Sequence, residues 1–279
     1  MEQNNNEINQ EKSVQNYFSN YANIYYKENY DDDSKNCYSY SHIIRKNHII
    51  RMFDKDGGKV LDIGCGPGVI TLHLLMKECE VWGVDISEEM INEASRFVEG
   101  TKFNNMAHFS VGDIKALDFP NNYFDAVICS GVLEYLDNEE LAITEINRVL
   151  KQNGTAIIAV PTPHRLYTFS LKLFKRIFKS FIPLAIKLKR KRIDREYRGN
   201  NSIRNFNQKT YSPTKLNELL LNNKFEKKDY AYYHFISYFI SLFAPSISLY
   251  FGEKLDSMLF REKIFGRLSK GYIVKVKKL

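Results

Sequence analysis

The sequence has few cysteines, and none of them is spaced for a disulfide framework or a metal site. Its four cysteines, Cys37, Cys65, Cys79 and Cys129, are scattered along 279 residues, without the paired spacing of zinc-binding or disulfide-rich chains. The first residues, Met-Glu-Gln-Asn-Asn-Asn, also lack the pattern of a secretory signal. These absences favour a reducing, cytoplasmic setting.

Acidic residues are scarce in one stretch, which accounts for the basic charge of the whole chain. Between Arg165 and Arg198 there are twelve Lys or Arg against Asp194 and Glu196, about +10, so the rest of the +7 chain carries about −3. Within Arg165–Ser180, helical spacing gathers the basic side chains on one face and aromatic and aliphatic ones on the other. This basic helix is expected either to cover the protein as a lid or to contact an anionic membrane peripherally, on its inner surface.

A run of apolar residues long enough for a membrane span is missing. The uncharged run Phe235–Phe251 has seventeen residues and is interrupted by Pro245 and four serines, whereas a span needs about 20 apolar residues. We therefore expect an apolar helical insertion here, and the sequence leaves open whether it is a lid, a membrane contact or an oligomer interface. The oligomeric state is likewise left open.

From Lys59 onward, short apolar runs alternate with helical segments, a pattern typical of a parallel sheet covered on both faces. Gly154 is expected to form the turn before the fifth run, and Pro161 closes it. The fold class that this indicates is α/β, a doubly wound, mostly parallel seven-stranded sheet. The expected strands are Val60–Ile63, Val81–Val84, His108–Val111, Ala126–Cys129, Ala156–Val160, Glu226–Tyr233 and Tyr272–Val276.

Two helices are expected before the sheet. Apolar residues recur at helical spacing from Ser13 to Tyr25, after a polar first dozen residues that we expect to be frayed, and a second helix is expected from His42 to Phe53. The expected units are an N-terminal helical cap (1–55), a cofactor-binding α/β core (56–163), a basic helical insertion or lid (164–210), and a C-terminal completion of the sheet (211–279) that contains an apolar insertion (234–262).

A glycine-rich turn follows the first expected strand, in Val60-Leu61-Asp62-Ile63-Gly64-Cys65-Gly66-Pro67-Gly68. Glycine lets the backbone bend tightly and approach a ligand closely. A dinucleotide-binding turn reads Gly-X-Gly-X-X-Gly and receives a pyrophosphate, whereas Gly68 comes one position early and Asp62 would repel that group. A carboxylate at Asp62 suits the ammonium group of S-adenosylmethionine, so the turn favours this cofactor over NAD.

Two further acids end successive strands. Asp85 is placed to accept both hydroxyl hydrogens of a ribose, and Asp113 to accept from the amino group of adenine. Ile86 and Ile114, directly after these acids, are expected to sandwich the adenine ring. A single acid at a strand end is usually a helix cap, but three on one sheet after this turn indicate a nucleoside site.

These motifs resemble those of the class I S-adenosylmethionine-dependent methyltransferases, especially the branch of ubiquinone and menaquinone biosynthesis. The resemblance covers about Val14 to Pro163 and is most specific in Leu61–Gly68. It implies that Gly64, Cys65, Gly66 and Gly68 line the cofactor. It also implies that aromatic residues of the motif Val14–Tyr25, including Tyr17 and Tyr25, close over the cofactor, and that Ser130 lies near its methionyl group.

The chain departs from this branch after the fourth strand. Where many relatives read Leu-Glu-His, this chain reads Leu133-Glu134-Tyr135, so a histidine base is missing there, and only one of three ligands of a metal used by some relatives remains. We therefore predict no metal. If a base is needed, the candidates are His164, Tyr135 and His42, for each of which a structural role is the simpler alternative.

The acceptor is expected to be a small or hydrophobic, lipid-linked molecule. The chain has no Asn-Pro-Pro-Tyr or Asp-Pro-Pro-Tyr after the fourth strand and no Pro-Cys nucleophile, which are signatures of nucleic-acid methylation, so no nucleic-acid partner is expected. Oxygen is favoured over nitrogen or carbon as the methylated atom. The alternatives are N- or C-methylation of a natural product, a non-catalytic adenosylmethionine-binding module, or an NAD-dependent oxidoreductase.

Overall fold

The structure is a computed structural model, and it describes the chain except residues 1, 31–36, 164–205, 236–253, 263–265 and 267. The expected basic helix Arg165–Ser180, the candidate base His164 and nearly all of the apolar run Phe235–Phe251 lie outside the described residues.

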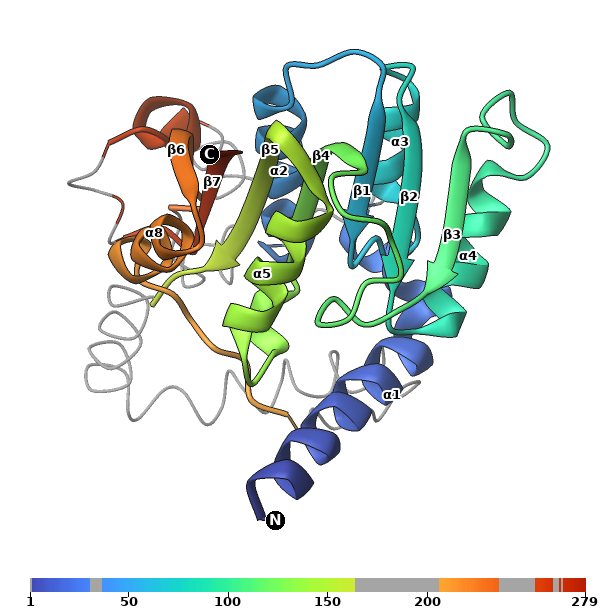
Figure 1. Cartoon of the computed structure of the whole chain (residues 1–279), viewed down its shortest axis with the longest axis horizontal. Coiled ribbons are helices and arrows are strands. Elements are labelled where there is room, and N and C mark those ends of the chain that lie inside the picture. Colours follow the sequence, from blue (N-terminus) through green and yellow to red (C-terminus); the bar gives the residue numbers. More distant parts are fainter. Residues whose placement is uncertain (1, 31–36, 164–205, 236–253, 263–265, 267) are drawn as a thin grey trace, which may run out of the picture.

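A seven-stranded sheet forms the centre of the molecule, with the order β3-β2-β1-β4-β5-β7-β6 (Figure 1). Neighbouring strands are parallel except that β7 is antiparallel to both β5 and β6. The predicted fold class is therefore confirmed. The strands are β1 (Lys59–Ile63), β2 (Glu80–Asp85), β3 (Ala107–Val111), β4 (Phe124–Ser130), β5 (Leu150–Pro161), β6 (Phe225–Tyr233) and β7 (Gly271–Lys278).

Helices cover both faces of the sheet, because its central strands are apolar on both sides. In β5, Ala156, Ile158 and Val160 belong to one core cluster, and the alternating Ile157 and Ala159 belong to the other. The first cluster includes α5 (Glu139–Val149) and α8 (Pro213–Asn222), and the second includes α2 (Cys37–Met52), α3 (Val69–Leu75) and α4 (Glu88–Val98). The remaining elements are α1 (Glu2–Tyr30) and the short 3-10 helix η1 (Leu133–Tyr135).

The first helix, α1, is longer than expected. It begins at Glu2 rather than Ser13, so the prediction of a frayed first dozen residues is wrong. Contacts with distant parts of the chain explain the difference, since Gln10 Nε2 donates to the carbonyl of Tyr135 (2.9 Å) and Glu11 forms an ion pair with Lys115. Such tertiary contacts stabilise helix turns that the local sequence leaves marginal.

The fifth strand also differs from its expected form. It begins at Leu150 and pairs with β4 on both sides of an irregularity, with Leu150 opposite Phe124 and Thr155 opposite Ala126. The residue with positive φ in this irregular stretch is Asn153 (φ 64°), not Gly154. Gly154 is needed for packing instead, because a Cβ atom there would lie 2.7 Å from Leu150 Cγ.

Helix α1 runs along the edge of the sheet at which the parallel strands end (Figure 1). Gln15 Nε2 donates to the carbonyl of Ile86 (2.9 Å), and the hydroxyl of Ser19 lies 3.1 Å from that of Ser87. Ile86 and Ser87 follow directly after the end of β2. The carboxyl ends of parallel strands are where open α/β sheets bind ligands. Within the described ranges, no helix is both long and apolar enough to cross a bilayer.

Candidate active site

The glycine-rich turn links β1 to α3 through three glycines with positive φ, Gly64 (67°), Gly66 (51°) and Gly68 (81°). The amides of Gly64 and Cys65 both donate to the carbonyl of Val84 on β2, at 2.7 and 3.2 Å. These bonds hold the turn against the end of the neighbouring strand. Residues with a Cβ rarely adopt this backbone conformation, which explains the glycines.

The three glycines have different surroundings. A Cβ atom on Gly64 would lie 2.2 Å from Val132 Cγ2, and one on Gly68 would lie 3.4 Å from the Cβ of Ala94. On Gly66 it would meet only Met90 Sδ, at 4.0 Å. Gly64 therefore has a close packing role, whereas the backbone at Gly66 is the part of the turn that a ligand can approach.

Asp62 lies beneath the turn and is 1 % exposed. Its Oδ2 accepts a hydrogen bond from the Thr71 hydroxyl of α3 (2.7 Å). Burial raises the pKa of Asp62 to about 7; the Thr71 bond lowers it, and the nearby carboxylate of Asp85 raises it further. An ionised Asp62 is therefore costly in this environment, and a cation beside it would offset the cost.

Asp85 connects the glycine turn with the start of α4. One carboxylate oxygen accepts from the amide of Gly66 (2.9 Å), and the other accepts from the amide of Ser87 (3.0 Å). Burial raises the pKa of Asp85, while these amide bonds lower it. Each carboxylate oxygen has a second lone pair, so Asp85 retains the capacity to accept from ligand hydroxyls.

Asp113 lies at the same edge, just beyond β3, and its side chain is 39 % exposed. Its Oδ1 accepts from the amide of Lys115 (2.9 Å), and the Lys115 ammonium lies 3.7 Å from Oδ2. Ile86 is partly exposed, whereas Ile114 is 5 % exposed and packs in the core. The three acids thus share one edge, and the adenine sandwich stays a prediction.

An aromatic cluster joins α1 to the end of β4. The ring of Tyr17 lies 5.3 Å from that of Phe206, which lies 5.5 Å from that of Tyr135. Tyr25 packs edge-on against His42 of α2, with the ring centres 6.0 Å apart. Tyr17, Tyr25, His42 and Tyr135 are thereby brought together, although they are far apart in the sequence.

A half-buried cation of α2, which the sequence did not predict, lies at the end of β4. The Arg45 guanidinium of α2 lies against Gly131 so closely that a Cβ there would be 2.9 Å from its Nη1. Arg45 also contacts His42 (Nη2 to Nδ1, 3.1 Å) and the hydroxyls of Tyr30 and Tyr233. A glycine at 131, after Ser130 and with φ 76°, was the only local signal of this approach.

Within the part of the chain that the structure describes, two polar atoms at this end of β4 have no hydrogen-bond partner, Ser130 Oγ and Glu134 Oε2. Glu134 is 2 % exposed, and burial raises its pKa to about 7, an effect that Arg45 opposes. Tyr135, the candidate base beside it, has its hydroxyl 3.4 Å from Gln208 Nε2. Nowhere in the described ranges do three His, Cys, Asp or Glu side chains gather so as to hold a metal ion.

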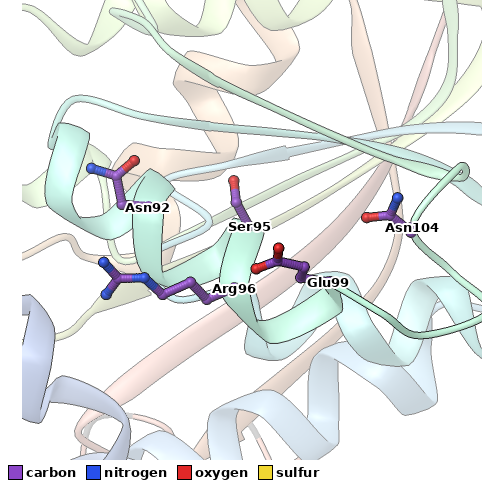
Figure 2. A pocket seen from close by; sticks show the side chains of 5 residues that line it. All are labelled: Asn92, Ser95, Arg96, Glu99 and Asn104. Carbon is purple, nitrogen blue, oxygen red and sulfur yellow. The ribbon is translucent and has the colours of Figure 1, made fainter.

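A shallow depression of about 500 Å³ lies elsewhere, on the outer side of α4. Figure 2 shows Asn92, Ser95, Arg96 and Glu99 along the helix and Asn104 on the following loop. Because α4 begins at the edge where β2 ends and runs away from it, this hollow lies off the edge that carries the three acids.

Comparison with known proteins finds similarity to methyltransferases over part of the chain. Residues 61–158 match the family described as a methyltransferase domain. The chain is 32 % identical over 151 residues to a demethylmenaquinone methyltransferase of Staphylococcus haemolyticus, covering 53 % of this chain and 62 % of that protein. It is 31 % identical over 102 residues to a phosphatidylethanolamine N-methyltransferase of Cereibacter sphaeroides, covering 37 % of this chain and 50 % of that protein.

A solved structure shares the fold over nearly the whole chain. It is the magnesium protoporphyrin IX methyltransferase of Synechocystis with bound SAH, at a TM-score of 0.60 and 16 % identity, covering 97 % of this chain and 100 % of that one. At this identity the likeness concerns the fold alone. The chain spans 62 % and 50 % of the length of these two curated relatives. The turn, the three acids and β4 lie within residues 61–158, the segment that matches the family. Residues 61–158 match a methyltransferase domain, and the resemblance to class I S-adenosylmethionine-dependent methyltransferases is confirmed over that segment.

Proposed function

We propose that this chain uses S-adenosylmethionine to methylate a small-molecule or lipid-like acceptor, at oxygen. The observation that carries the proposal is the edge formed by β1, β2 and β3. There the open backbone at Gly66 is bonded to Asp85, and Asp62 and Asp113 lie on either side along the strand ends. Polar acceptors are thus arranged along one edge in the order that an amino acid joined to a nucleoside requires.

The residues present fit this cofactor. Asp62 is buried and held at a raised pKa, so the ammonium of a methionyl group would stabilise its charged form, while Asp85 would accept from the ribose and Asp113 from the adenine. Gly64, Cys65 and Gly68 shape the turn, and Ser130 Oγ, which has no partner, would donate to the carboxylate of the methionyl group. When bound, S-adenosylmethionine supplies a methyl group on a positively charged sulfur.

The protein's own contribution is alignment and exclusion of water. Helix α1 and its aromatic residues Tyr17 and Tyr25 form a cap over the cofactor edge. The insertion 164–210 is a lid over the acceptor, because both of its described ends lie at that edge: the amide of Tyr211 donates to the carbonyl of Pro161 (2.8 Å), and Phe206 packs on Tyr135.

The acceptor is lipid-like in this proposal. The relatives named above act, by their names, on demethylmenaquinone and phosphatidylethanolamine, and another is named a sterol 24-C-methyltransferase. The twelve basic residues between Arg165 and Arg198 would bring the acceptor site to an anionic membrane surface. Binding to phosphatidylglycerol vesicles that is lost in high salt would support this contact, and no binding at low salt would leave only the lid.

Methyl transfer is tested in two steps. Calorimetry with S-adenosylhomocysteine measures binding, and incubation with labelled S-adenosylmethionine and a panel of quinols, phospholipids, sterols and phenols measures transfer. Binding and transfer to a hydroxyl are the expected results. Binding with no transfer to any panel member would favour the non-catalytic module, and no binding would contradict the proposal.

The cap has its own test. Deleting residues 1–30 is expected to abolish transfer, because the cap would no longer exclude water, while far-UV circular dichroism still shows the folded sheet. Changing Tyr26, whose side chain is exposed on the same helix (43 %), to Ala is the matched control and should leave transfer unchanged. A truncated protein with full activity would rule the cap out.

A further inference from the structure

Glu134 is a buried carboxylate with one oxygen, Oε2, that has no hydrogen-bond partner among the described residues. The residue is 2 % exposed, and its Oε2 has no hydrogen-bond partner. A buried polar atom without a partner is costly, and a buried carboxylate oxygen is among the most costly cases. Such an atom in a native fold calls for an explanation, and a donor from outside the chain, a bound water or a ligand, supplies one.

The backbone around Glu134 is fixed, so this lack of a partner is not a matter of a loose loop. The carbonyl of Glu134 accepts from the amide of Lys209 (2.8 Å), and the carbonyl of Leu133 accepts from the hydroxyl of Tyr211 (2.9 Å). The segment Lys209–Tyr211 therefore holds η1 at the end of β4. Ser130, whose Oγ also lacks a partner among the described residues, is close to η1 in the sequence. In the proposed function, the acceptor meets the methyl group at this end of the sheet.

Arg45 balances the charge of Glu134 without pairing with it. Among the residues that the structure describes, no carboxylate forms a salt bridge with Arg45, yet Arg45 and Glu134 are close enough to influence each other's ionisation. Because the two charges cancel, the pair suits a neutral group better than a free anion or cation. A neutral group that can donate a hydrogen to Oε2 and whose oxygen then gains charge beside Arg45 fits both partners.

We propose that Glu134 is the catalytic base and that its Oε2 takes the proton from a hydroxyl acceptor, an alcohol or a phenol, while Arg45 stabilises the charge that develops on the acceptor oxygen. This assignment rests on the proposed methyl transfer and narrows it to acceptors with an O–H group. It replaces His164 and Tyr135 as the base.

The step balances in atoms and charge. The O–H bond breaks and its proton passes to Oε2, the acceptor oxygen forms a bond to the methyl carbon, and the carbon–sulfur bond breaks with its electron pair going to sulfur. Glu134 ends neutral and returns its proton to water after release. Burial raises the pKa of Glu134 to about 7 against the lowering effect of Arg45, which suits a base near neutral pH.

The groups that face Glu134 come from every element around it. They are Arg45 of α2, Cys129 of β4, Tyr233 of β6, and Gln208 and Tyr211 of the segment before α8. Burial raises the pKa of Tyr233 to about 12, and it also raises the pKa values of Cys129 and Tyr211. None of these groups therefore changes charge near neutral pH. Burial also raises the pKa of Asp62 to about 7, but the ammonium of bound S-adenosylhomocysteine would keep Asp62 ionised in the proposed function, so a titration seen in that complex is assigned to Glu134.

The test uses two probes, 4-fluorophenol and its methyl ether 4-fluoroanisole, in which a methyl group replaces the hydroxyl hydrogen and so removes the hydrogen-bond donor. Binding of each to the full chain saturated with S-adenosylhomocysteine is followed by fluorine NMR from pH 5.5 to 8.5, a range in which a phenol stays protonated, as tyrosine does. At high pH we expect 4-fluorophenol to bind about tenfold more tightly than 4-fluoroanisole, the scale of a hydrogen bond to a charged group. This preference should fall as Glu134 is protonated below a midpoint near 7.

Two variants sharpen the result. Glu134→Gln should remove the pH dependence of the preference, whereas Glu140→Gln, the same change at an exposed carboxylate of α5, should keep it. Should Glu134→Gln fail to fold in a thermal melt, the pH dependence of the unaltered protein decides by itself. Failure to bind 4-fluorophenol, or equal affinity for both probes across the pH range, would overturn the assignment, while loss of S-adenosylhomocysteine binding would instead defeat the proposed function.

Discussion

The two halves of the strand-end edge differ in how far the protein satisfies its own polar groups. At β1, β2 and β3, each acid has a partner within the chain: Asp62 has Thr71, Asp85 has the amides of Gly66 and Ser87, and Asp113 has Lys115. At the end of β4, Ser130 Oγ and Glu134 Oε2 have none. Among the described residues, the first half is thus organised by the chain itself, and we propose that a bound ligand completes the second.

Within the β1–β3 half of the edge, the largest effect of a substitution is expected at Gly64. In Gly64→Ala the new Cβ would lie 2.2 Å from Val132 Cγ2, at a residue with φ 67°. The combined strain and overpacking are expected to lower the free energy of unfolding by about 2–5 kcal/mol, measured by urea denaturation. Adding Val132→Ala should restore part of the loss.

Gly66→Ala is the matched control for Gly64. Its Cβ would meet only Met90 Sδ at 4.0 Å, so the cost is the backbone strain at φ 51°, about 1–2 kcal/mol. Affinity for S-adenosylhomocysteine should fall in this variant, because the added methyl stands where the ligand approaches the turn. Equal losses of unfolding free energy in the two variants would contradict the assignment of Gly64 to close packing and of Gly66 to the open part of the turn.

The second prediction concerns Asp62, whose ionisation makes the free energy of unfolding of the ligand-free protein depend on pH. Because burial raises its pKa from 3.8 to about 7, the protonated form stabilises the fold below pH 3.8, and that contribution is lost as the pH rises to about 7. Relative to the unaltered protein, Asp62→Asn should therefore gain stability over this window, by on the order of 2–4 kcal/mol.

Urea denaturation at a series of pH values measures the difference at Asp62. The control is Asp118→Asn, at an exposed acid, which should give a difference that does not change with pH. S-adenosylhomocysteine should reduce the gain of Asp62→Asn, because its ammonium stabilises the ionised Asp62. A pH-independent difference at Asp62 would show that this carboxyl is not held at a raised pKa.

Much of the organised half is visible in the sequence, because its signals are local. The strand runs and the turn Gly64–Gly68 were predicted within a few residues, since buried parallel strands are continuous apolar runs and glycine adopts positive φ most readily. The extension of α1 to Glu2 was missed, because it depends on contacts of Gln10 and Glu11 with distant residues. For the same reason, the approach of Arg45 to Gly131 and Glu134 could not be predicted from the sequence, in which Gly131 itself is the one local signal.

The third prediction concerns Asp85, which connects the turn with α4. Asp85→Ala removes the acceptor for two backbone amides and for the ribose, so affinity for S-adenosylhomocysteine should fall by about 1–3 kcal/mol in calorimetry. Asp85→Asn, which keeps one acceptor oxygen, should lose less. An unchanged affinity in Asp85→Ala would defeat the assignment of the ribose.

The smallest effect is expected at Asp113, because its side chain is 39 % exposed and already accepts from Lys115. Asp113→Ala should cost about 0.5–1 kcal/mol of affinity for S-adenosylhomocysteine, the lower part of the range for one hydrogen bond. The decisive comparison uses S-inosylhomocysteine, in which a carbonyl replaces the amino group of adenine and would face the Asp113 carboxylate.

The unaltered protein should prefer the adenosyl ligand about two- to fivefold, and Asp113→Ala should lose this preference. Asp118→Ala, at the exposed acid of the same connection between β3 and β4, should retain it. If the preference survives in Asp113→Ala, the adenine amino group binds elsewhere, and the organised half of the edge ends at Asp85.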